Sequence, residues 1–234
     1  MSIETTQPWQ SDSARPLSAV LRDIVSLAKP RITLMVVLTA AGGMWLAPQS
    51  LDPWTAMLML VTTATVVASA NALNCWLERD SDRLMARTRT RPLPDRRLAP
   101  NIALWFGVSL GLISVPVLTF FVNPLTGLLG AIALISYVAV YTPMKRISSV
   151  SLLVGAVPGA LPPLMGWTAA TNSLDAPGLV LFAILFLWQV PHFIAIAIYR
   201  QNEYEKAGLI TLPTSHGLPA AKRQAVFYTG ALLI

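Results

Sequence analysis

Three oxygen-bearing side chains recur at four-residue intervals where a strongly apolar segment meets a charged one. Asn74, Glu78 and Asp82 have this spacing, so on a helix they would share one face. We name these three residues the acidic ladder. Carboxylate and amide oxygens suit Mg²⁺, which proteins typically hold with one or two carboxylates together with substrate phosphates. The spacing therefore indicates a metal site, although Arg79 and Arg83 could instead neutralise Glu78 and Asp82 as ordinary interfacial acids.

A basic run follows the ladder directly. Residues 87–92 read Arg-Thr-Arg-Thr-Arg-Pro, and guanidinium forks beside hydroxyls can bind phosphate oxygens. Arg87 and Arg91 are the candidates for this role. A basic loop alone would equally fit contact with anionic lipid. Metal ligands and phosphate donors beside an apolar segment are what departure of a diphosphate requires, so together they favour a prenyl diphosphate as substrate.

The composition indicates that membrane helices position these residues. The 234 residues are 54% hydrophobic and 12% charged, with a mean hydropathy of +0.59, whereas about 25% of a soluble domain is charged. A soluble globular protein is therefore excluded. The single Cys75 also excludes an internal disulfide and a CxxC metal site.

The apolar stretches predict an all-α, polytopic transmembrane bundle. Six stretches are long enough to cross a bilayer, and a seventh, from about residue 225, is cut off by the end of the chain. The six stretches are residues 32–48, 54–77, 102–121, 125–142, 150–169 and 177–198. The fifth stretch contains Pro158, Pro162 and Pro163, so we expect it to be broken or kinked. We expect residues 1–30 to form a cytoplasmic N-terminal segment and residues 31–234 a single transmembrane domain that is incomplete at its C-terminus.

The cations are distributed as a membrane topology predicts. All 17 Lys and Arg residues lie before the first stretch, between the second and third, after the fourth or after the sixth. By the positive-inside rule, the N-terminus and the loop of residues 79–101 face the cytoplasm. The net charge of +6 thus reflects topology and gives no reason to expect nucleic acid as a partner. The first residues match no cleaved signal or transit peptide, which favours a multi-pass protein of a bacterial inner membrane.

Four segments in the same order carry a family resemblance. Residues 69–92, which contain the acidic ladder, resemble the first aspartate-rich motif of the UbiA-type intramembrane prenyltransferases. Residues 141–146, residues 155–163, and residues 188–193 with their continuation to 208 resemble further segments of that family, and most closely its haem-farnesylating branch. The resemblance implies a bundle of about nine spans around a central cavity. It also implies that the ladder holds Mg²⁺ and diphosphate, with Glu78 where the family usually has Asp.

The resemblance implies further site residues. In the wider family a second acid-rich motif follows the sixth span, but here residues 199–206 replace part of the acids with cations. We expect Arg200, with Lys145 or Arg146, to neutralise the diphosphate there. His192 would bind haem as an axial ligand or through a propionate, or it is a structural hydrogen-bond donor. Four aromatic residues could stabilise an allylic cation or belong to an interfacial belt. They are Trp76, Tyr137, Tyr141 and Trp188.

The activity implied by the resemblance is transfer of a farnesyl group from farnesyl diphosphate to a vinyl group of protohaem IX (haem B). Water addition would then give haem O for terminal oxidases, with Mg²⁺ as cofactor, haem B as substrate, and haem A synthase or an oxidase as partner in the bilayer. Three alternatives stay open. They are a sibling enzyme acting on an aromatic quinone precursor, a non-catalytic haem-binding assembly protein, and a transporter that uses a broken fifth helix.

Overall fold

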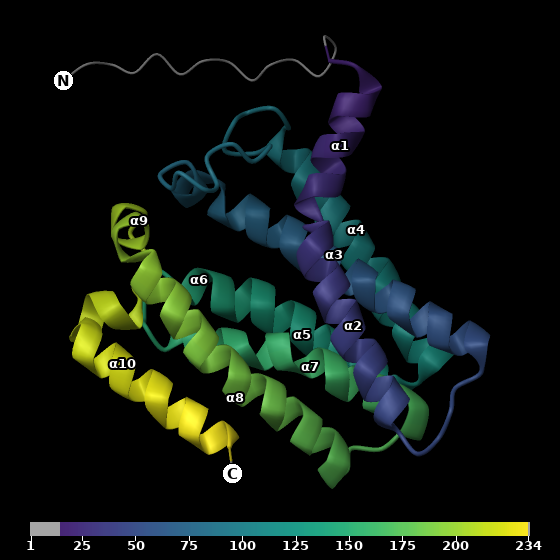
Figure 1. Cartoon of the computed structure of the whole chain (residues 1–234). Helices are drawn as coiled ribbons and strands as arrows, with labels where there is room; N and C mark the ends of the chain where they lie inside the picture. The colour runs from purple at the N-terminus through teal and green to yellow at the C-terminus, as the bar shows by residue number, and fades with distance from the viewer. Residues whose placement is uncertain (1–14, 234) are drawn as a thin grey trace, which may run out of the picture.

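The computed structural model describes residues 15–233, and all regular structure in this range is helical (Figure 1). The elements are α1 (Leu17–Leu27), α2 (Pro30–Leu46), α3 (Pro53–Asp82), α4 (Pro100–Val117), the π-helix η2 (Leu118–Val122), α5 (Pro124–Ile135), the π-helix η3 (Ser136–Tyr141), α6 (Thr142–Met144), α7 (Ser151–Thr171), α8 (Ala176–Tyr199), α9 (Gln201–Lys206) and α10 (Leu212–Leu232). The predicted all-α class is confirmed.

Local sequence signals fix where several helices begin. Proline occupies an early position of α2, α3, α4 and α5, where its missing N–H costs nothing. Asp52 caps α3 by accepting hydrogen bonds from two backbone N–H groups. Asn123 caps α5 and Asp175 caps α8 in the same way. These caps satisfy donors that would otherwise be unpaired at the start of each helix.

The predicted spans are confirmed as long apolar helices. Within the described residues, α3, α4 with η2, α5 through α6, α7 and α8 are each long and apolar enough to cross a membrane. The pair α1 and α2, bent by 45° at the break between them, adds a sixth candidate. The chain is therefore an integral membrane protein. The last helix, α10, packs along α8, and its backbone kinks at Gly217, where φ is +79°.

The fifth span was expected to be broken or kinked, and the structure shows that it is not broken. Helix α7 is continuous over 21 residues although it contains Pro158, Pro162 and Pro163. It lies in the centre of the bundle, where α2, α5 and α8 pack around it (Figure 1). Packing by neighbouring helices explains why the prolines do not interrupt it. The discontinuous helix that a transporter site would need is thus absent from this segment.

Helices α2 and α7 approach each other at backbone distance. A Cβ atom added to Gly43 would lie 1.9 Å from the carbonyl oxygen of Pro163, and one added to Gly166 would lie 1.9 Å from that of Ala40. Small residues at a helix interface permit this kind of contact within a membrane. The two glycines therefore fix the distance between the first span and the central helix.

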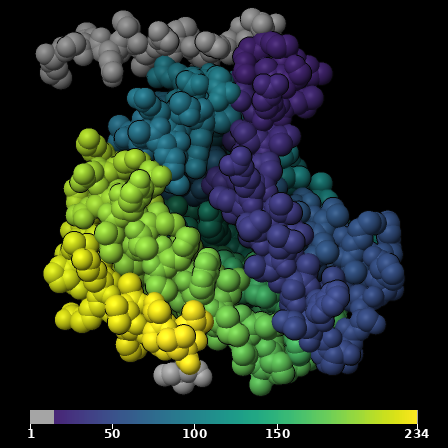
Figure 2. Space-filling model, in the orientation of Figure 1, coloured from purple at the N-terminus to yellow at the C-terminus, as the bar shows by residue number. Residues whose placement is uncertain are grey.

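A large cavity opens among α2, α3, η3, α7 and α8. Its volume is about 760 Å³, and Figure 2 shows the surface hollowed between α2 and α8. The end of the cavity farther from the C-terminus of α3 is apolar and includes Val66, Leu134 and Met165. The other end is reached by the C-terminal part of α3, the loop of residues 83–99 and α6. The fold therefore places the acidic ladder at the mouth of an apolar chamber.

Candidate active site

Each residue of the acidic ladder is paired with a cation from another part of the chain. Lys29 Nζ donates to Asn74 Oδ1 at 3.0 Å, and Lys145 Nζ donates to Glu78 Oε1 at 2.8 Å. Arg91 Nη1 donates to Asp82 Oδ2, also at 2.8 Å. Asn74 and Asp82 are only 2% and 1% exposed, and burying the charge of Asp82 would be costly without a partner. Ladder and cations together line the charged end of the cavity.

The neighbouring arginines do not neutralise the ladder. Arg79 and Arg83 instead lie 3.9 Å and 3.8 Å from the carboxylate of Asp80, which is exposed. The structure therefore contradicts the alternative in which Glu78 and Asp82 are interfacial acids neutralised by Arg79 and Arg83. The charges that balance the ladder come from the residue before α2, the basic loop and the residue after α6.

Lys145 is held between a carboxylate and an aromatic ring. Its Nζ lies 4.4 Å from the centroid of the Tyr141 ring, a cation–π distance. Burial lowers the pKa of Lys145, but the nearby Tyr141 and Glu78 raise it more, so the net pKa lies above its ordinary value. The contacts with Glu78 and Tyr141 therefore favour the charged form of Lys145. The Tyr137 ring packs next, with its centroid 5.2 Å from that of Tyr141.

The loop of residues 83–99 carries two arginines to the cavity and is fastened by its own side chains. Arg87 and Arg91 both line the cavity. The buried Thr88 lies between them and donates a hydrogen bond to the backbone oxygen of Asp82 at 2.8 Å. Leu93 and Leu98 are buried in a cluster formed with α1, α3 and α4. The basic run is therefore an ordered part of the site.

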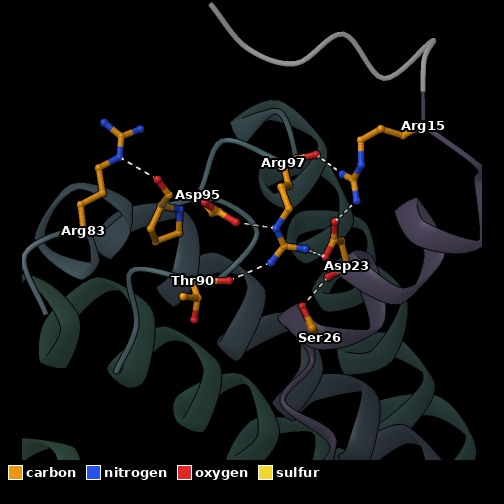
Figure 3. A network of polar contacts seen from close by, with 8 residues as sticks. Arg15, Asp23, Ser26, Arg83, Thr90, Asp95 and Arg97 are labelled. Carbon is orange, nitrogen blue, oxygen red and sulfur yellow. Dashed lines mark hydrogen bonds and ion pairs between the residues drawn. The ribbon is translucent and has the colours of Figure 1, made fainter. Parts of the chain in front are cut away.

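Helix α1 clamps the far side of this loop, as Figure 3 shows. The Asp23 carboxylate is buried and accepts hydrogen bonds from Arg97 and from Arg15, the latter at 2.7 Å. Arg97 Nη2 also donates to the backbone oxygen of Thr90 at 2.7 Å. We call Arg15, Asp23 and Arg97 the loop clamp. It connects the N-terminal helix to the segment between Arg87 and Arg91.

The structure brings most of the predicted site residues together and leaves two outside. Seven of them line the cavity: Asn74, Glu78, Asp82, Arg87, Arg91, Lys145 and His192. Arg146 and Arg200 do not belong to that lining. Arg146 donates to Ser81 Oγ at 3.2 Å, and Arg200 pairs with Glu203 at 3.1 Å. Arg146 therefore bonds the residue that precedes Asp82 but no ladder side chain, and Arg200 bonds a residue of α9.

Three of the four predicted aromatic residues also line the cavity. They are Tyr137, Tyr141 and Trp188. The imidazole of His192 stacks on Trp188, with ring centroids 5.0 Å apart and planes 14° from parallel. Trp76 instead lies beneath Arg79, 5.2 Å from its guanidinium, outside the cavity lining.

Sequence reasoning missed Lys29 as a site residue. Lys29 has a left-handed backbone conformation, with φ of 48° and ψ of 66°, and it immediately precedes the proline that starts α2. This turn directs its ammonium group onto Asn74. A lysine placed between a short amphipathic helix and the first span was the available signal. The sequence analysis used the charge of Lys29 only to predict the membrane topology.

The oxygen donors of the ladder fit a hard divalent cation. Within residues 15–233, no three His, Cys, Asp or Glu side chains group as a metal site. The ladder offers two carboxylates and one amide oxygen, and such a set suits Mg²⁺ when phosphate oxygens complete its coordination. Each ion pair occupies one carboxylate oxygen, so the other remains for a metal.

Comparison with known proteins places the chain in a family. The model of the UbiA prenyltransferase family matches residues 36–234, and the chain belongs to that family. It is similar to the protoheme IX farnesyltransferase of Myxococcus xanthus, with 54% identity over 94% of this chain and 75% of the relative. The protoheme IX farnesyltransferase of Anaeromyxobacter dehalogenans is 48% identical over 100% of this chain and 78% of the relative.

Solved structures share the fold. A UbiA homolog from Archaeoglobus fulgidus, bound to GPP and Mg²⁺, superimposes with a TM-score of 0.75 and 19% sequence identity. The alignment covers 90% of this chain and 75% of the other. At this identity the comparison establishes the helical architecture alone.

Proposed function

We propose that this chain is a protoheme IX farnesyltransferase, which joins the farnesyl group of farnesyl diphosphate to a vinyl group of haem B and adds water to give haem O. The observation that carries the proposal is the acidic ladder, with its cations, at the mouth of an apolar cavity. The high identity to relatives of that name supports haem as acceptor. The ladder favours an enzyme over a non-catalytic haem-binding protein, which would have no use for it.

The charged end of the cavity would hold the diphosphate. Asn74, Glu78 and Asp82 would hold Mg²⁺, and the Mg²⁺ in the related Archaeoglobus structure supports this requirement. Bound there, the ion would supply positive charge to the leaving diphosphate. Lys145 and Arg91 already donate hydrogen bonds to ladder carboxylates. They would turn toward the diphosphate oxygens when the substrate binds. Such preorganised charges stabilise a leaving group as its negative charge develops.

The apolar end would take the farnesyl chain and exclude water from the allylic carbon. Tyr137 and Tyr141 line the cavity beside Lys145 and would stabilise an allylic cation or a cation-like transition state there. The acceptor would enter beside His192 and Trp188, whose stacked rings form part of the same wall. His192 would then contact haem through its imidazole.

The distribution of cations supports an address and an orientation. The ladder end of the bundle contains the loop clamp, the loop of residues 83–99 and Lys145. Helix α1 and this loop lie at the top of Figure 1. By the positive-inside rule this end faces the cytoplasm. We place the protein in a bacterial inner membrane with its N-terminal segment, residues 1–30, in the cytoplasm. Haem O would pass from there to haem A synthase or a terminal oxidase.

An acceptor assay tests the proposed function. Membranes containing the chain receive farnesyl diphosphate and Mg²⁺ together with either haem B or a phenolic quinone precursor, and the products are separated by mass. Farnesylated, hydrated haem is the expected product. A prenylated phenol with unchanged haem B would instead show that the chain is a sibling enzyme with another acceptor. Membranes carrying Asp82→Asn serve as the control for background activity.

A further inference from the structure

Two of the cations that line the cavity have no partner. Three of the five donate hydrogen bonds to the acidic ladder. The other two, Arg31 and Arg87, form no hydrogen bond or ion pair with any group in residues 15–233. Arg87 belongs to the basic run and is a candidate for binding the diphosphate. A guanidinium group without a partner is suited to an anion that arrives with a substrate, and for Arg31 that anion remains to be identified.

Arg31 lies on the side of α2 that faces the cavity. Met35 and Thr39 follow it at four-residue intervals, and all three line the cavity, as side chains on one helical face can do. Arg31 belongs to the first turn of α2 and is exposed, whereas Thr39 lies two turns farther along the helix. The guanidinium group is therefore the charged end of an uncharged row of side chains, where the cavity opens.

Helix α8 forms the opposite side of the opening. Trp188, His192 and Ile196 have the same four-residue spacing and also line the cavity. The surface is hollowed between α2 and α8 (Figure 2), and the start of α2 and the end of α8 lie toward the same end of the bundle (Figure 1). An acceptor that enters beside His192 therefore meets Arg31 on the facing helix.

The charges of the cavity allow an anion besides the diphosphate. The lining has five cations and two carboxylates, which gives a net charge of +3. An ionised diphosphate ester with one Mg²⁺ contributes about one negative charge, so about two positive charges remain. Haem B carries two propionate carboxylates. Its binding would therefore bring the occupied site close to neutrality.

We infer that Arg31 binds a propionate of haem B and thereby positions the acceptor, an inference that rests on the proposed function. A guanidinium group can donate two parallel hydrogen bonds to a carboxylate, which fixes the orientation of the bound group as well as its position. The vinyl groups lie on the porphyrin edge opposite the propionates. Holding the propionate edge at the first turn of α2 therefore directs a vinyl group into the cavity. Arg31 contacts the acceptor away from the reacting atoms, so it acts in binding and not in bond formation.

Esterified haem gives a readout that isolates this contact. In protohaem dimethyl ester both propionates are neutral methyl esters, and the vinyl groups are unchanged. Because Arg31 binds a carboxylate, the wild-type protein should prefer haem B over the diester as acceptor. An arginine that only contacts lipid headgroups would affect the two acceptors alike.

The test measures kcat/KM for both acceptors, at a fixed concentration of farnesyl diphosphate, with the wild-type protein, Arg31→Met and Arg31→Lys in nanodiscs. We expect the wild-type protein to prefer haem B about tenfold or more. Arg31→Met should lose most of this preference through a raised KM for haem B, with an unchanged KM for farnesyl diphosphate. Arg31→Lys keeps the charge without the planar fork and should retain part of the preference.

Two other arginines provide matched controls. Arg22 is exposed on α1 and does not belong to the cavity lining, so Arg22→Met should behave as the wild-type protein does. Arg87→Met removes the other guanidinium group that has no partner. This variant should raise the KM for farnesyl diphosphate and keep the preference for haem B over the diester.

Several results would overturn the inference. Equal use of haem B and the diester by the wild-type protein would show that the carboxylates are not recognised. An undiminished preference in Arg31→Met would assign the recognition to another group, and a raised KM for farnesyl diphosphate in that variant would place Arg31 on the diphosphate. A lower thermal midpoint in both Arg31 variants, with the preference kept, would assign Arg31 a structural role. If the wild-type protein farnesylates neither acceptor, the proposed function has failed, and the inference fails with it.

Discussion

Lys145 Nζ lies 2.8 Å from Glu78 Oε1 across a gap of 67 residues in the sequence. The contact joins the end of α6 to the acidic ladder on α3 at the mouth of the cavity. A lysine in this position balances the ladder while the site is empty of anions and faces an arriving diphosphate. Arg91, which donates a hydrogen bond to Asp82, balances the ladder in the same way. The charge pattern of the site is thus established by the fold before any substrate binds.

Removing one ladder charge should abolish most activity. In Asp82→Asn we expect turnover to fall about 10²-fold or more, since a metal ligand and the partner of Arg91 are lost together. Asp80→Asn makes the same chemical change on an exposed residue whose ion-pair partners within residues 15–233 are Arg79 and Arg83, and should retain near wild-type turnover. Haem O formation in membranes measures both. Equal losses in the two variants would refute a specific role for the ladder.

Lys29 should contribute to binding of the diphosphate. Replacing it with Met removes a cation that lines the cavity and bonds Asn74. We expect the KM for farnesyl diphosphate to rise about tenfold, with a smaller change in kcat. Lys222→Met, on the exposed side of α10, provides the matched control. A fall in kcat at unchanged KM would instead place Lys29 in the chemical step.

The loop clamp should keep the basic loop closed. Asp23→Asn removes the buried charge that holds Arg15 and Arg97, so we expect trypsin to cut the loop of residues 83–99 about tenfold faster. The KM for farnesyl diphosphate should rise as well. Asp95→Asn also removes a partner of Arg97, but an exposed one, and should leave the cleavage rate nearly unchanged. Wild-type cleavage in Asp23→Asn would show that the clamp does not order the loop.

The contact of α2 with α7 should depend on Gly43 and tolerate change at its neighbour. A Cβ atom at Gly43 meets the Pro163 backbone, whereas one at Gly42 meets nothing within 4 Å. We expect Gly43→Ala to destabilise the protein by about 1–3 kcal/mol and Gly42→Ala to be neutral or slightly stabilising. Thermal unfolding in detergent or nanodiscs compares them. Equal thermal unfolding midpoints of the two variants would mean that α2 and α7 can move apart with little loss of stability.

The fold class and the spans were predictable because membrane helices follow simple rules of length and apolarity. Each predicted stretch corresponds to a helix. The fate of α7 was not predictable from Pro158, Pro162 and Pro163 alone. Local propensity favours a break there, and the tertiary packing around the helix prevents it.

The site was predictable only as far as spacing along one helix could take it. Asn74, Glu78 and Asp82 could be grouped because the period of an α-helix places them together. The basic run and the family resemblance added Arg91 and Lys145, but the pairing of each cation with one ladder residue could not be predicted, since Lys29 and Lys145 lie 45 and 67 residues away from the side chains they bond.

Binding of a non-hydrolysable donor tests the central claim most directly. Farnesyl thiodiphosphate is titrated into the protein in nanodiscs with and without Mg²⁺, and the titration is repeated with Asp82→Asn and Asp80→Asn. We expect tight binding that requires Mg²⁺, is lost in Asp82→Asn and is retained in Asp80→Asn. Equal binding with and without Mg²⁺, and equal binding by the wild-type protein and both variants, would contradict the assignment of the acidic ladder as the metal and diphosphate site.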